Sequence, residues 1–457
     1  MALFAQASGI HLLFFQIRPK KIHIIIMVWF YRLLYFPGIL IALPYYLLRM
    51  LRRGGYAKCF QHRLGFFHKL KPCPAGKKRV WIQAVSVGEV LAVQSLIDLL
   101  QKDGKIEIVL TTTTSTGYAE ALNRYTNVVH SIGIFPLDFW LFNAIAWKRI
   151  QPDAIILTES ELWPEHLHKA KKQKIPTYLI NARISDKSFS RYKKVPKIAG
   201  QMLEKISSVF PASNLDRDRL LELGCPRERI SVAGNIKFDV SNNSTLSDSE
   251  KKVLRHSLGF GDEDTFVLLG SSTWPGEEIA LLRAQRAIIK QGIDCRLLLV
   301  PRHAERAPEI LKLLKSQDLA WSQRSKDHYP KDNLHIHLAD TTGELAHLTQ
   351  AADLAFIGKS IPPNKGGQTP IEAANAGIPI ITGPKMNNFK DISKTLVLSG
   401  ATKIARDAND LVKVVTELAS DSIVLAGMRK AAFQWHKLNR GSSERIASHI
   451  RESLSGH

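Results

Sequence analysis

The sequence predicts an α/β protein made of two successive doubly wound domains, each built on a largely parallel sheet. The chain has 457 residues, about three times the length of a typical domain, so two core-forming domains plus appendages are expected. From about residue 80 onward, short apolar runs alternate with helical patterns, which is typical of βαβ units. A polar stretch at 241–245 interrupts this rhythm, which then restarts. We therefore predict a first Rossmann-like domain at 54–240 and a second at 241–430, with a cleft between them.

The expected elements follow one another with short connections. In the first domain we expect strands at 80–85, 106–111, 154–158 and 177–181. Helices are expected there at 90–100 and from Tyr118. In the second domain we expect strands at 265–270, 296–300, 334–338, 354–357 and 379–381. Helices are expected there at 278–290 and 307–316. The pattern is helical from Asp407 on, and 431–457 is a candidate C-terminal helix that packs back on the first domain.

Residues 1–53 are interpreted as an N-terminal membrane-anchoring segment. The run 22–48 carries only His23 and Arg32 as side chains with ionisable nitrogens, and about 20 apolar residues suffice to span a bilayer. Prolines interrupt this run and an arginine cluster follows it, as on a cytoplasmic flank. The alternatives are a spanning helix, an interfacial helix and a buried core helix. A further hypothesis is that translation starts at Met27.

The charge is concentrated at the N-terminus. The formal net charge is 63 − 41 = +22, and the first 88 residues contribute fourteen Lys and Arg without any Asp or Glu. A basic excess predicts an anionic partner, and the candidates are nucleic acid, acidic lipid and a phosphorylated substrate. Because aliphatic and aromatic residues interleave with the basic ones, a membrane surface is favoured. No nucleic-acid-binding module is recognisable, so no nucleic-acid partner is expected.

Metal, disulfide and P-loop chemistry find little support in the sequence. The four cysteines show no C-x-x-C spacing, which argues against a zinc site or disulfide framework and favours a reducing compartment. His335 and His337 alternate within a predicted strand without further ligands. Gly358-Lys359-Ser360 matches the end of a P-loop, but Asp353 stands where that motif needs glycine. We expect no metal and no cofactor.

The first acidic residue of the chain, Glu89, ends the motif Ser86-Val87-Gly88-Glu89 between a predicted strand and a helix. Serine followed three positions later by glutamate is a capping box, so Glu89 could simply satisfy backbone donors. The same position favours an ionised carboxylate that accepts a proton, because a helix N-terminus stabilises negative charge. Both interpretations stay open on the residues alone.

Further polar residues follow other predicted strands. Thr158-Glu159-Ser160-Glu161 ends a strand with two carboxylates, and Arg183 after the next strand could pair with either of them. In the second domain, Pro301-Arg302-His303 offers an arginine for a phosphate or carboxylate, and Gly270-Ser271-Ser272-Thr273 offers backbone amides. Gly366-Gly367 leads into a helix whose Glu372 either caps it or binds ribose hydroxyls.

In combination, these motifs resemble the 3-deoxy-D-manno-octulosonic acid (Kdo) transferases of lipopolysaccharide biosynthesis. The resemblance runs from about Trp29 to the C-terminal helices. It rests on the order Ser-Val-Gly-Glu, Glu-Ser-Glu-Leu-Trp-Pro, Asn-Ala-Arg, Ile-Lys-Phe-Asp, Pro-Arg-His, Thr-Gly-Glu-Leu and Gly-Gly-x-x-Pro-x-Glu. The resemblance implies a GT-B fold and an inverting glycosyltransferase that moves Kdo from CMP-Kdo to a lipid A precursor, lipid IVA. It also implies attachment to the cytoplasmic face of the inner membrane.

The family's functional residues carry over by position. Glu89 would be the proton acceptor, and Glu159 and Lys237 would stabilise the transition state. The CMP-sugar site would be lined by Pro301, Arg302, Thr342, Gly343, Glu344, Thr369, Pro370, Ile371 and Glu372. Two positions depart from the family pattern: Thr369 stands where asparagine is common, and Lys359 where glycine is frequent. Lys359 would either add a positive charge near the donor or point to solvent.

Two rival interpretations remain from the sequence. One is a GT-B transferase of lipid-linked sugars with a different nucleotide donor, and the other is a non-catalytic membrane-binding protein on the same scaffold. The motifs do not encode the number of Kdo units added, the acyl-chain preference or the oligomeric state.

Overall fold

A computed structural model of the chain describes residues 31–35, 37–42, 44, 48, 59–239, 246–261, 265–327 and 333–455. The chain divides into two compact units. The first unit comprises 1–91, 96–233 and 446–457, and the second comprises 92–95 and 234–445. The main segment of the second unit begins at Gly234, ahead of the expected linker at 241–245, and that linker lies outside the described residues.

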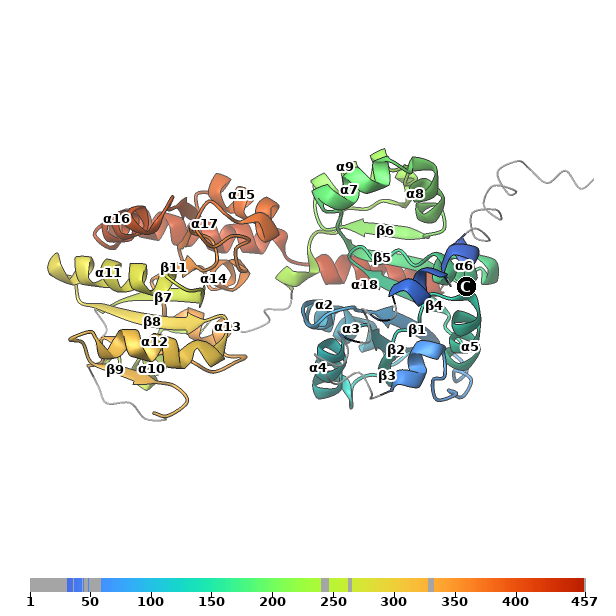
Figure 1. Cartoon of the computed structure of the whole chain (residues 1–457), viewed down its shortest axis with the longest axis horizontal. Helices are drawn as coiled ribbons and strands as arrows, with labels where there is room; N and C mark the ends of the chain where they lie inside the picture. Colours follow the sequence, from blue (N-terminus) through green and yellow to red (C-terminus); the bar gives the residue numbers. More distant parts are fainter. Residues whose placement is uncertain are drawn as a thin grey trace, which may run out of the picture. The chain divides into compact units, whose positions relative to one another are not determined.

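The first unit is built on a six-stranded parallel sheet in the order β3-β2-β1-β4-β5-β6 (Figure 1). Its strands are β1 (Lys78–Gln83), β2 (Ile106–Thr112), β3 (Ser131–Ile134), β4 (Ala154–Thr158), β5 (Thr177–Ala182) and β6 (Ser208–Pro211). The central strands are buried along almost their whole length, as continuous apolar runs predict for a sheet covered on both faces. The strand order reverses between β1 and β4, where open α/β sheets place their ligands.

Helices flank this sheet. They are α2 (Val87–Ala92), α3 (Gln94–Gln101), α4 (Ser115–Tyr125), α5 (Trp140–Ile150), α6 (Pro164–Gln173), α7 (Asp186–Lys193), α8 (Pro196–Leu203) and α9 (Asn214–Glu222), with 3₁₀ turns η1 (Phe60–Leu64) and η2 (Arg227–Arg229). The prediction of a single helix over 90–100 is wrong, because a turn at Val93 separates α2 from α3. The last helix, α18 (Ser442–Ser455), contributes its C-terminal part to this unit. There the Ser453 hydroxyl lies 2.8 Å from that of Tyr178.

The second unit has a seven-stranded parallel sheet in the order β13-β12-β11-β7-β8-β10-β9. Its strands are β7 (Phe266–Thr273), β8 (Cys295–Pro301), β9 (Trp321–Gln323), β10 (Ile336–Leu338), β11 (Leu354–Ile357), β12 (Ile380–Thr382) and β13 (Thr402–Ile404). The order reverses between β7 and β11, which is where doubly wound sheets generally bind ligands. Two parallel doubly wound sheets confirm the predicted fold class.

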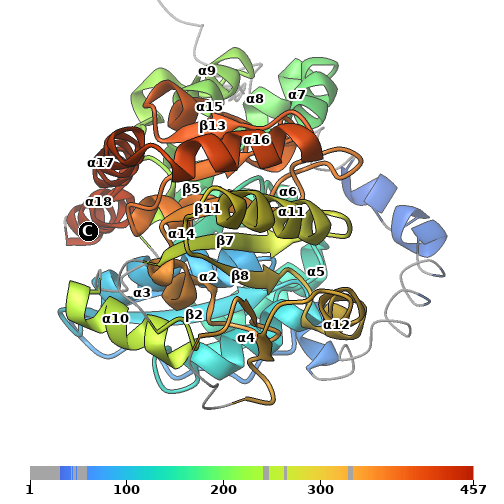
Figure 2. The same cartoon turned by 90° about the vertical axis from the view of Figure 1, so that its left-hand side faces the viewer.

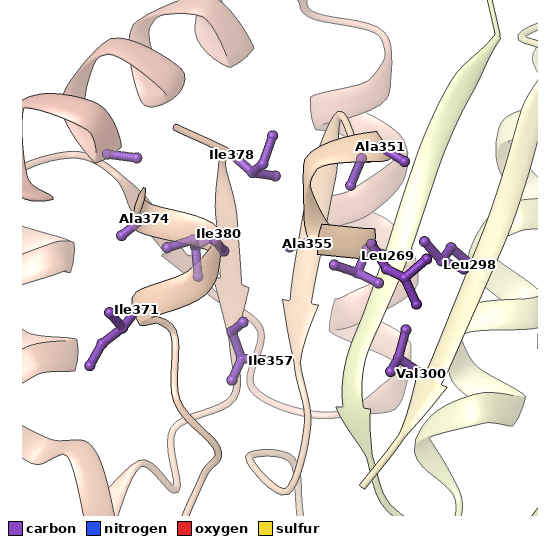
Figure 3. Packing of buried hydrophobic residues seen from close by; sticks show 14 of the residues in the cluster. Leu269, Leu298, Val300, Ala351, Ala355, Ile357, Ile371, Ala374, Ile378 and Ile380 are labelled. Carbon is purple, nitrogen blue, oxygen red and sulfur yellow. The ribbon is translucent and has the colours of Figure 1, made fainter. Parts of the chain in front are cut away.

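Helices also cover both faces of the second sheet, as the side view shows (Figure 2). They are α10 (Asp248–Ser257), α11 (Glu277–Lys290), α12 (Ala307–Lys315), α13 (Leu345–Leu348), α14 (Ile371–Asn375), α15 (Lys390–Leu398), α16 (Ala408–Ala419) and α17 (Ser422–Asn439), with 3₁₀ turns η3 (Ile236–Phe238), η4 (Ala304–Arg306), η5 (Thr349–Ala351) and η6 (Asn387–Phe389). In the core, Leu269, Ala355 and Ile380 from three neighbouring strands pack with Ile371 and Ala374 of α14 (Figure 3). Alanine on both sides of this contact lets the short helix lie close to the sheet.

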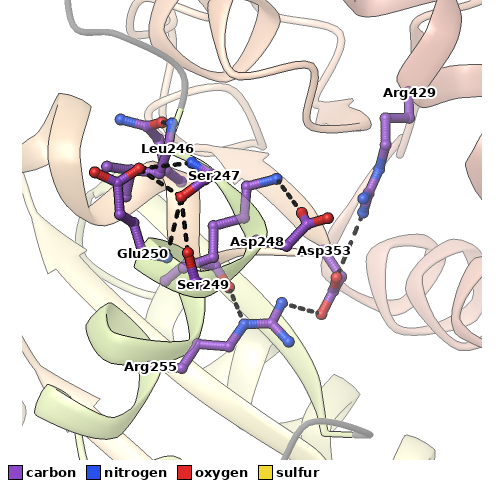
Figure 4. Close-up of polar contacts among 11 residues, drawn as sticks. Leu246, Ser247, Asp248, Ser249, Glu250, Arg255, Asp353 and Arg429 are labelled. Atoms are coloured by element: carbon purple, nitrogen blue, oxygen red, sulfur yellow. Dashed lines mark hydrogen bonds and ion pairs between the residues drawn. The ribbon is translucent and has the colours of Figure 1, made fainter.

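The start of α10 is held by an ordinary capping box (Figure 4). The Glu250 amide donates to the Ser247 hydroxyl at 3.3 Å, and the Ser247 amide donates to the Glu250 carboxylate at 2.8 Å. Farther along α10, Arg255 forms a 2.7 Å ion pair with Asp353, which also accepts the Val267 amide. These contacts fix α10 to the beginning of β7 and β11.

The described part of the N-terminal segment is tied to the first unit by two carboxylates. The Tyr31 hydroxyl donates to Asp138 at 3.0 Å, and the Arg32 guanidinium contacts both oxygens of Glu165 at 2.6 and 2.9 Å. No helix within the described residues combines the length and apolarity needed to cross a membrane. The run 22–48 lies partly, and the hypothetical start at Met27 wholly, outside those residues.

Candidate active site

Glu89 lies in the first turn of α2, directly after β1, and only 8% of it is exposed. Its carboxylate does not form the predicted capping box. One oxygen accepts from the Val85 amide at 2.9 Å and contacts the Thr158 hydroxyl at the end of β4, while the other accepts from the Ser86 hydroxyl at 2.9 Å. The carboxylate therefore reaches across the point where the strand order reverses.

Two of the three groups that contact Glu89 are hydroxyls, which can either donate or accept a hydrogen bond. The Thr158 hydroxyl faces two oxygens, the Glu89 carboxylate and the Gln83 carbonyl at 3.0 Å, but it has one hydrogen. When Glu89 is ionised, Thr158 can donate to it. When Glu89 holds a proton, Thr158 can turn its hydrogen to Gln83 and accept the carboxyl hydrogen. The site can thus hold Glu89 in either protonation state without an unpaired polar group.

Opposing influences set the acidity of Glu89. Burial raises its pKa above the ordinary carboxyl value, and the nearby charge of Glu159 adds to this. The hydrogen bonds from Thr158, Val85 and Ser86 pull its pKa down. Because burial prevails, Glu89 is a stronger base than an exposed carboxylate, as a general base requires.

The two acids that follow β4 lie in different environments. Glu159 has a left-handed backbone with φ +53°. Glu161 accepts a 2.7 Å hydrogen bond from the Trp163 indole, and burial together with the charges of Glu89 and Glu159 raises its pKa to about 7. Arg183 donates its backbone amide to the Glu159 carbonyl at 3.4 Å, which places it beside these acids, and pairing of its side chain with either of them stays a prediction.

Lys237 is presented by the short turn η3 in the second unit. The Asn235 side chain accepts from the Lys237 amide at 3.0 Å, and Ile236 and Phe238 on either side are buried. Asp239 fixes the end of the turn, because its carboxylate accepts from the Gly441 and Ser443 amides at 2.7 and 2.6 Å. The neighbours of Lys237 are thus structural, and the lysine side chain is half-exposed.

The residues expected to bind the donor follow the strands of the second sheet. Pro301 ends β8, and the exposed Arg302 donates its amide to the Thr273 carbonyl at 3.2 Å. The Arg302 charge lowers the pKa of Glu372 in α14, although burial raises it overall. The Thr369 hydroxyl accepts from the Ile371 amide, after Pro370, and donates to Glu372 at 3.1 Å. Thr369 therefore completes this helix start.

The Thr342-Gly343-Glu344 stretch lies after β10, before α13, and Gly343 has φ +88°. Arg324 forms a 2.7 Å ion pair with Glu344, and Thr341 contacts the same carboxylate. These partners lower the pKa of Glu344. In the first unit the charge of Glu89 thus raises the pKa of Glu161, and in the second the charge of Arg302 lowers the pKa of Glu372. Glu344 is instead paired with Arg324.

Four non-glycine residues near strand ends in the two units have left-handed backbones that sequence reasoning did not predict. They are Glu159 after β4, Asn181 in β5, Ser272 in β7 and Lys359 after β11, with φ between +50° and +59°. This conformation is strained for residues with a Cβ atom and is concentrated at functional sites. Asn181 is 1% exposed, and its side-chain oxygen has no hydrogen-bond partner within the described residues. A sequence signal was lacking because none of these positions is a glycine.

Within the described residues, no group of three His, Cys, Asp or Glu side chains is arranged to hold a metal ion. Glu89 and Glu161 accept instead from hydroxyl, amide and indole donors.

The comparisons with known proteins agree with this arrangement. Residues 58–240 match the family model for "3-Deoxy-D-manno-octulosonic-acid transferase (kdotransferase)". The chain is 31% identical over 406 residues to the 3-deoxy-D-manno-octulosonic acid transferase of Haemophilus influenzae, covering 87% of this chain and 92% of that one. The transferase of Bordetella pertussis is 30% identical over 418 residues, covering 89% and 94%.

Solved structures give the fold alone. UDP-GlcNAc 2-epimerase from Neisseria meningitidis matches 83% of this chain and 100% of its own at 15% identity, with a TM-score of 0.57. A glycosyltransferase from Rickettsia africae gives 0.56 with the same coverage and identity. The architecture is the predicted GT-B fold of two Rossmann-like units. Given its identity to relatives over nearly their whole length, the chain is a glycosyltransferase of the 3-deoxy-D-manno-octulosonic acid transferase family.

Proposed function

We propose that this enzyme transfers Kdo from CMP-Kdo to a phosphorylated lipid A precursor, lipid IVA, with inversion at the anomeric carbon. The observation that carries the proposal is Glu89, a buried carboxylate at the first sheet's strand-order reversal that can hold or release a proton. The names of the family and its relatives support Kdo as the transferred sugar, and we propose CMP-Kdo as its donor and a lipid A precursor as its acceptor.

In this reaction the acceptor hydroxyl loses its proton to Glu89 as its oxygen attacks the anomeric carbon of Kdo. The bond from that carbon to the CMP phosphate breaks, and CMP leaves with the electron pair. Negative charge grows on the departing phosphate, so positive side chains and amides must face it. We assign this role to Lys237 and Arg302, and we propose that the CMP-sugar site is lined by Pro301, Arg302, Thr342, Gly343, Glu344, Thr369, Pro370, Ile371 and Glu372. We assign Glu159 to transition-state stabilisation. No metal or cofactor is part of the proposal.

We further propose that the enzyme works on the cytoplasmic face of the inner membrane, with its N-terminal segment on an anionic lipid surface. The fourteen basic residues before Glu89 support this location. The described leader residues Leu33 and Ile41 are 71% and 81% exposed, which leaves apolar side chains available to lipid. Sedimentation with vesicles of phosphatidylglycerol or phosphatidylcholine tests this. Salt-sensitive binding to the anionic vesicles is expected, and equal binding to both would contradict it.

The decisive experiment is incubation of the full chain with CMP-Kdo and lipid IVA, followed by mass measurement of the product. Addition of one or more Kdo units is expected, and NMR of the product assigns the anomeric configuration. Thermal melts with CMP and UDP test the rival nucleotide donor, because only the true product nucleotide should raise the melting temperature. Stabilisation by UDP alone would reject CMP-Kdo.

A further inference from the structure

Lys359 stands at the strand-order reversal of the second sheet. It follows β11, and its neighbour across the reversal is the end of β7. Its ammonium nitrogen lies 4.1 Å from the centre of the Trp274 ring, and Trp274 follows β7. A cation at this distance from an indole face is attracted by it. The indole therefore holds the ammonium of the half-buried Lys359 at this edge of the sheet.

Hydrogen bonds to the Glu277 carboxylate and from the Gly367 amide hold the backbone at Lys359. The buried Glu277 carboxylate accepts from the amides of Trp274, Lys359 and Ser360 at 2.9, 2.9 and 3.1 Å. The Lys359 carbonyl accepts from the amide of Gly367 at 2.9 Å, which ties it to the glycine-rich turn before α14. Trp274 and Lys359 are consequently held in one arrangement by a single carboxylate.

Gly358 makes this arrangement possible by its close approach to β7. A Cβ atom built on Gly358 would meet the Ser272 carbonyl oxygen at 2.3 Å, so no side chain fits there. The next residue has φ +59°, a conformation that glycine adopts without strain and lysine does not. A lysine at this position therefore has a strained backbone, and it places a positive charge at this edge of the sheet.

That charge is open to a ligand. Within the described residues, Lys359 has no carboxylate partner, and its side chain is half-buried against the indole. One side of the ammonium faces the ring, so its N–H donors on the other side can bind an acceptor. Arg302 follows β8, the strand on the other side of β7, so two cations lie at the same edge of the sheet. The edge at a strand-order reversal is where doubly wound domains bind nucleotides.

We infer that Lys359 binds an anionic group of the donor substrate and that Trp274 holds the lysine in place for it. This inference rests on the proposed function. The donor carries two anionic groups, the phosphate that joins cytidine to the sugar and the carboxylate of the octulosonic acid.

The test compares Lys359→Met, Lys359→Arg and Lys359→Gly in the full chain, with Lys290→Met on the exposed end of α11 as the control. Calorimetry measures the affinity for CMP and for cytidine, and steady-state kinetics gives KM for CMP-Kdo. Loss of one charge-assisted contact predicts about tenfold weaker CMP binding by Lys359→Met at low salt, and cytidine binding should stay unchanged. Lys359→Arg should retain most of the affinity, and Lys290→Met all of it.

Lys359→Gly separates binding from folding, because it removes the strained backbone together with the charge. It should melt at or above the temperature of the unaltered chain and still bind CMP about tenfold more weakly. Weaker CMP binding assigns the phosphate as the ligand. Unchanged CMP binding with a raised KM for CMP-Kdo assigns the sugar carboxylate.

Unchanged values for CMP and CMP-Kdo in Lys359→Met would overturn the inference alone. Equal losses for CMP and cytidine would also overturn it, because they would show a structural role. Failure of the unaltered chain to bind CMP would overturn the proposed function and this inference together.

Discussion

Replacing Glu89 with glutamine should abolish transfer and leave the fold intact. The glutamine oxygen can take the place of the carboxylate oxygen that accepts from Val85 and Thr158, and its amide nitrogen can donate to the Ser86 hydroxyl. All three contacts are kept, so the free energy of unfolding should change by less than about 1 kcal/mol. An amide cannot take up the acceptor proton, so turnover should fall about 100- to 10,000-fold.

Glu89→Ala provides the contrast. It leaves the Val85 amide without its acceptor in a buried site, whereas Thr158 can still donate to the Gln83 carbonyl, and the lost acceptor should cost roughly 1–3 kcal/mol of stability. Glu250→Gln is the matched control, because Glu250 occupies the same Ser-x-x-Glu pattern and serves only to cap α10. Product mass per unit time, CMP affinity and chemical denaturation should be measured for all variants. Near-normal turnover by Glu89→Gln with CMP affinity preserved would refute the assignment of Glu89 as the base.

Three further predictions follow from the buried charges. Because the folded pKa of Glu161 is raised to about 7 from 4.5, its contribution to stability is present below pH 4.5 and is lost as pH rises through 7. Between pH 4.5 and pH 8 this group should lower the free energy of unfolding of the unaltered chain by up to about 3 kcal/mol, and Glu161→Gln should abolish that decrease. The same dependence of the unfolding free energy on pH in both proteins would contradict this. Arg32→Met should destabilise the first unit by about 3 kcal/mol, because Glu165 is left buried and unpaired, and adding Glu165→Gln should restore much of it in the same denaturation assay. Glu277→Ala should lower the melting temperature and weaken CMP binding, because Glu277 holds the backbone of Trp274 and Lys359. A change in only one of these two quantities would show that Glu277 does not support CMP binding through Lys359.

The sequence was sufficient for the fold class because the central strands of both sheets are continuous apolar runs. It was insufficient for β9 and β13, which are three residues long at the edges of the second sheet. β10 and β12 are equally short but fully buried and were predicted, whereas the edge strands β9 and β13 are only partly buried and are not continuous apolar runs. The break between α2 and α3 was missed because the apolar pattern continues through Val93, which is itself fully buried.

The limits of sequence reasoning at the site are clearest in the two Ser-x-x-Glu patterns. At Ser247 the pattern gives the expected capping box. At Ser86 the glutamate instead contacts Thr158, which is distant in the sequence and adjacent only because β1 and β4 pair. A local pattern cannot reveal a partner that tertiary structure supplies. The family resemblance, and not the local motif, therefore singled out Glu89.

The second unit contains a counterpart that sharpens the case for Glu89. Each sheet has a buried glutamate in the first turn of the helix after its first strand, and each glutamate reaches across the strand-order reversal to the end of the neighbouring strand. Glu277 accepts from backbone amides there, which can only donate, so a proton on its carboxylate would leave a donor unpaired. Glu89 instead meets the hydroxyls of Ser86 and Thr158, and a hydroxyl can reverse its hydrogen bond. The same placement therefore makes Glu277 a fixed structural anion and makes Glu89 a group that can take a proton and give it back.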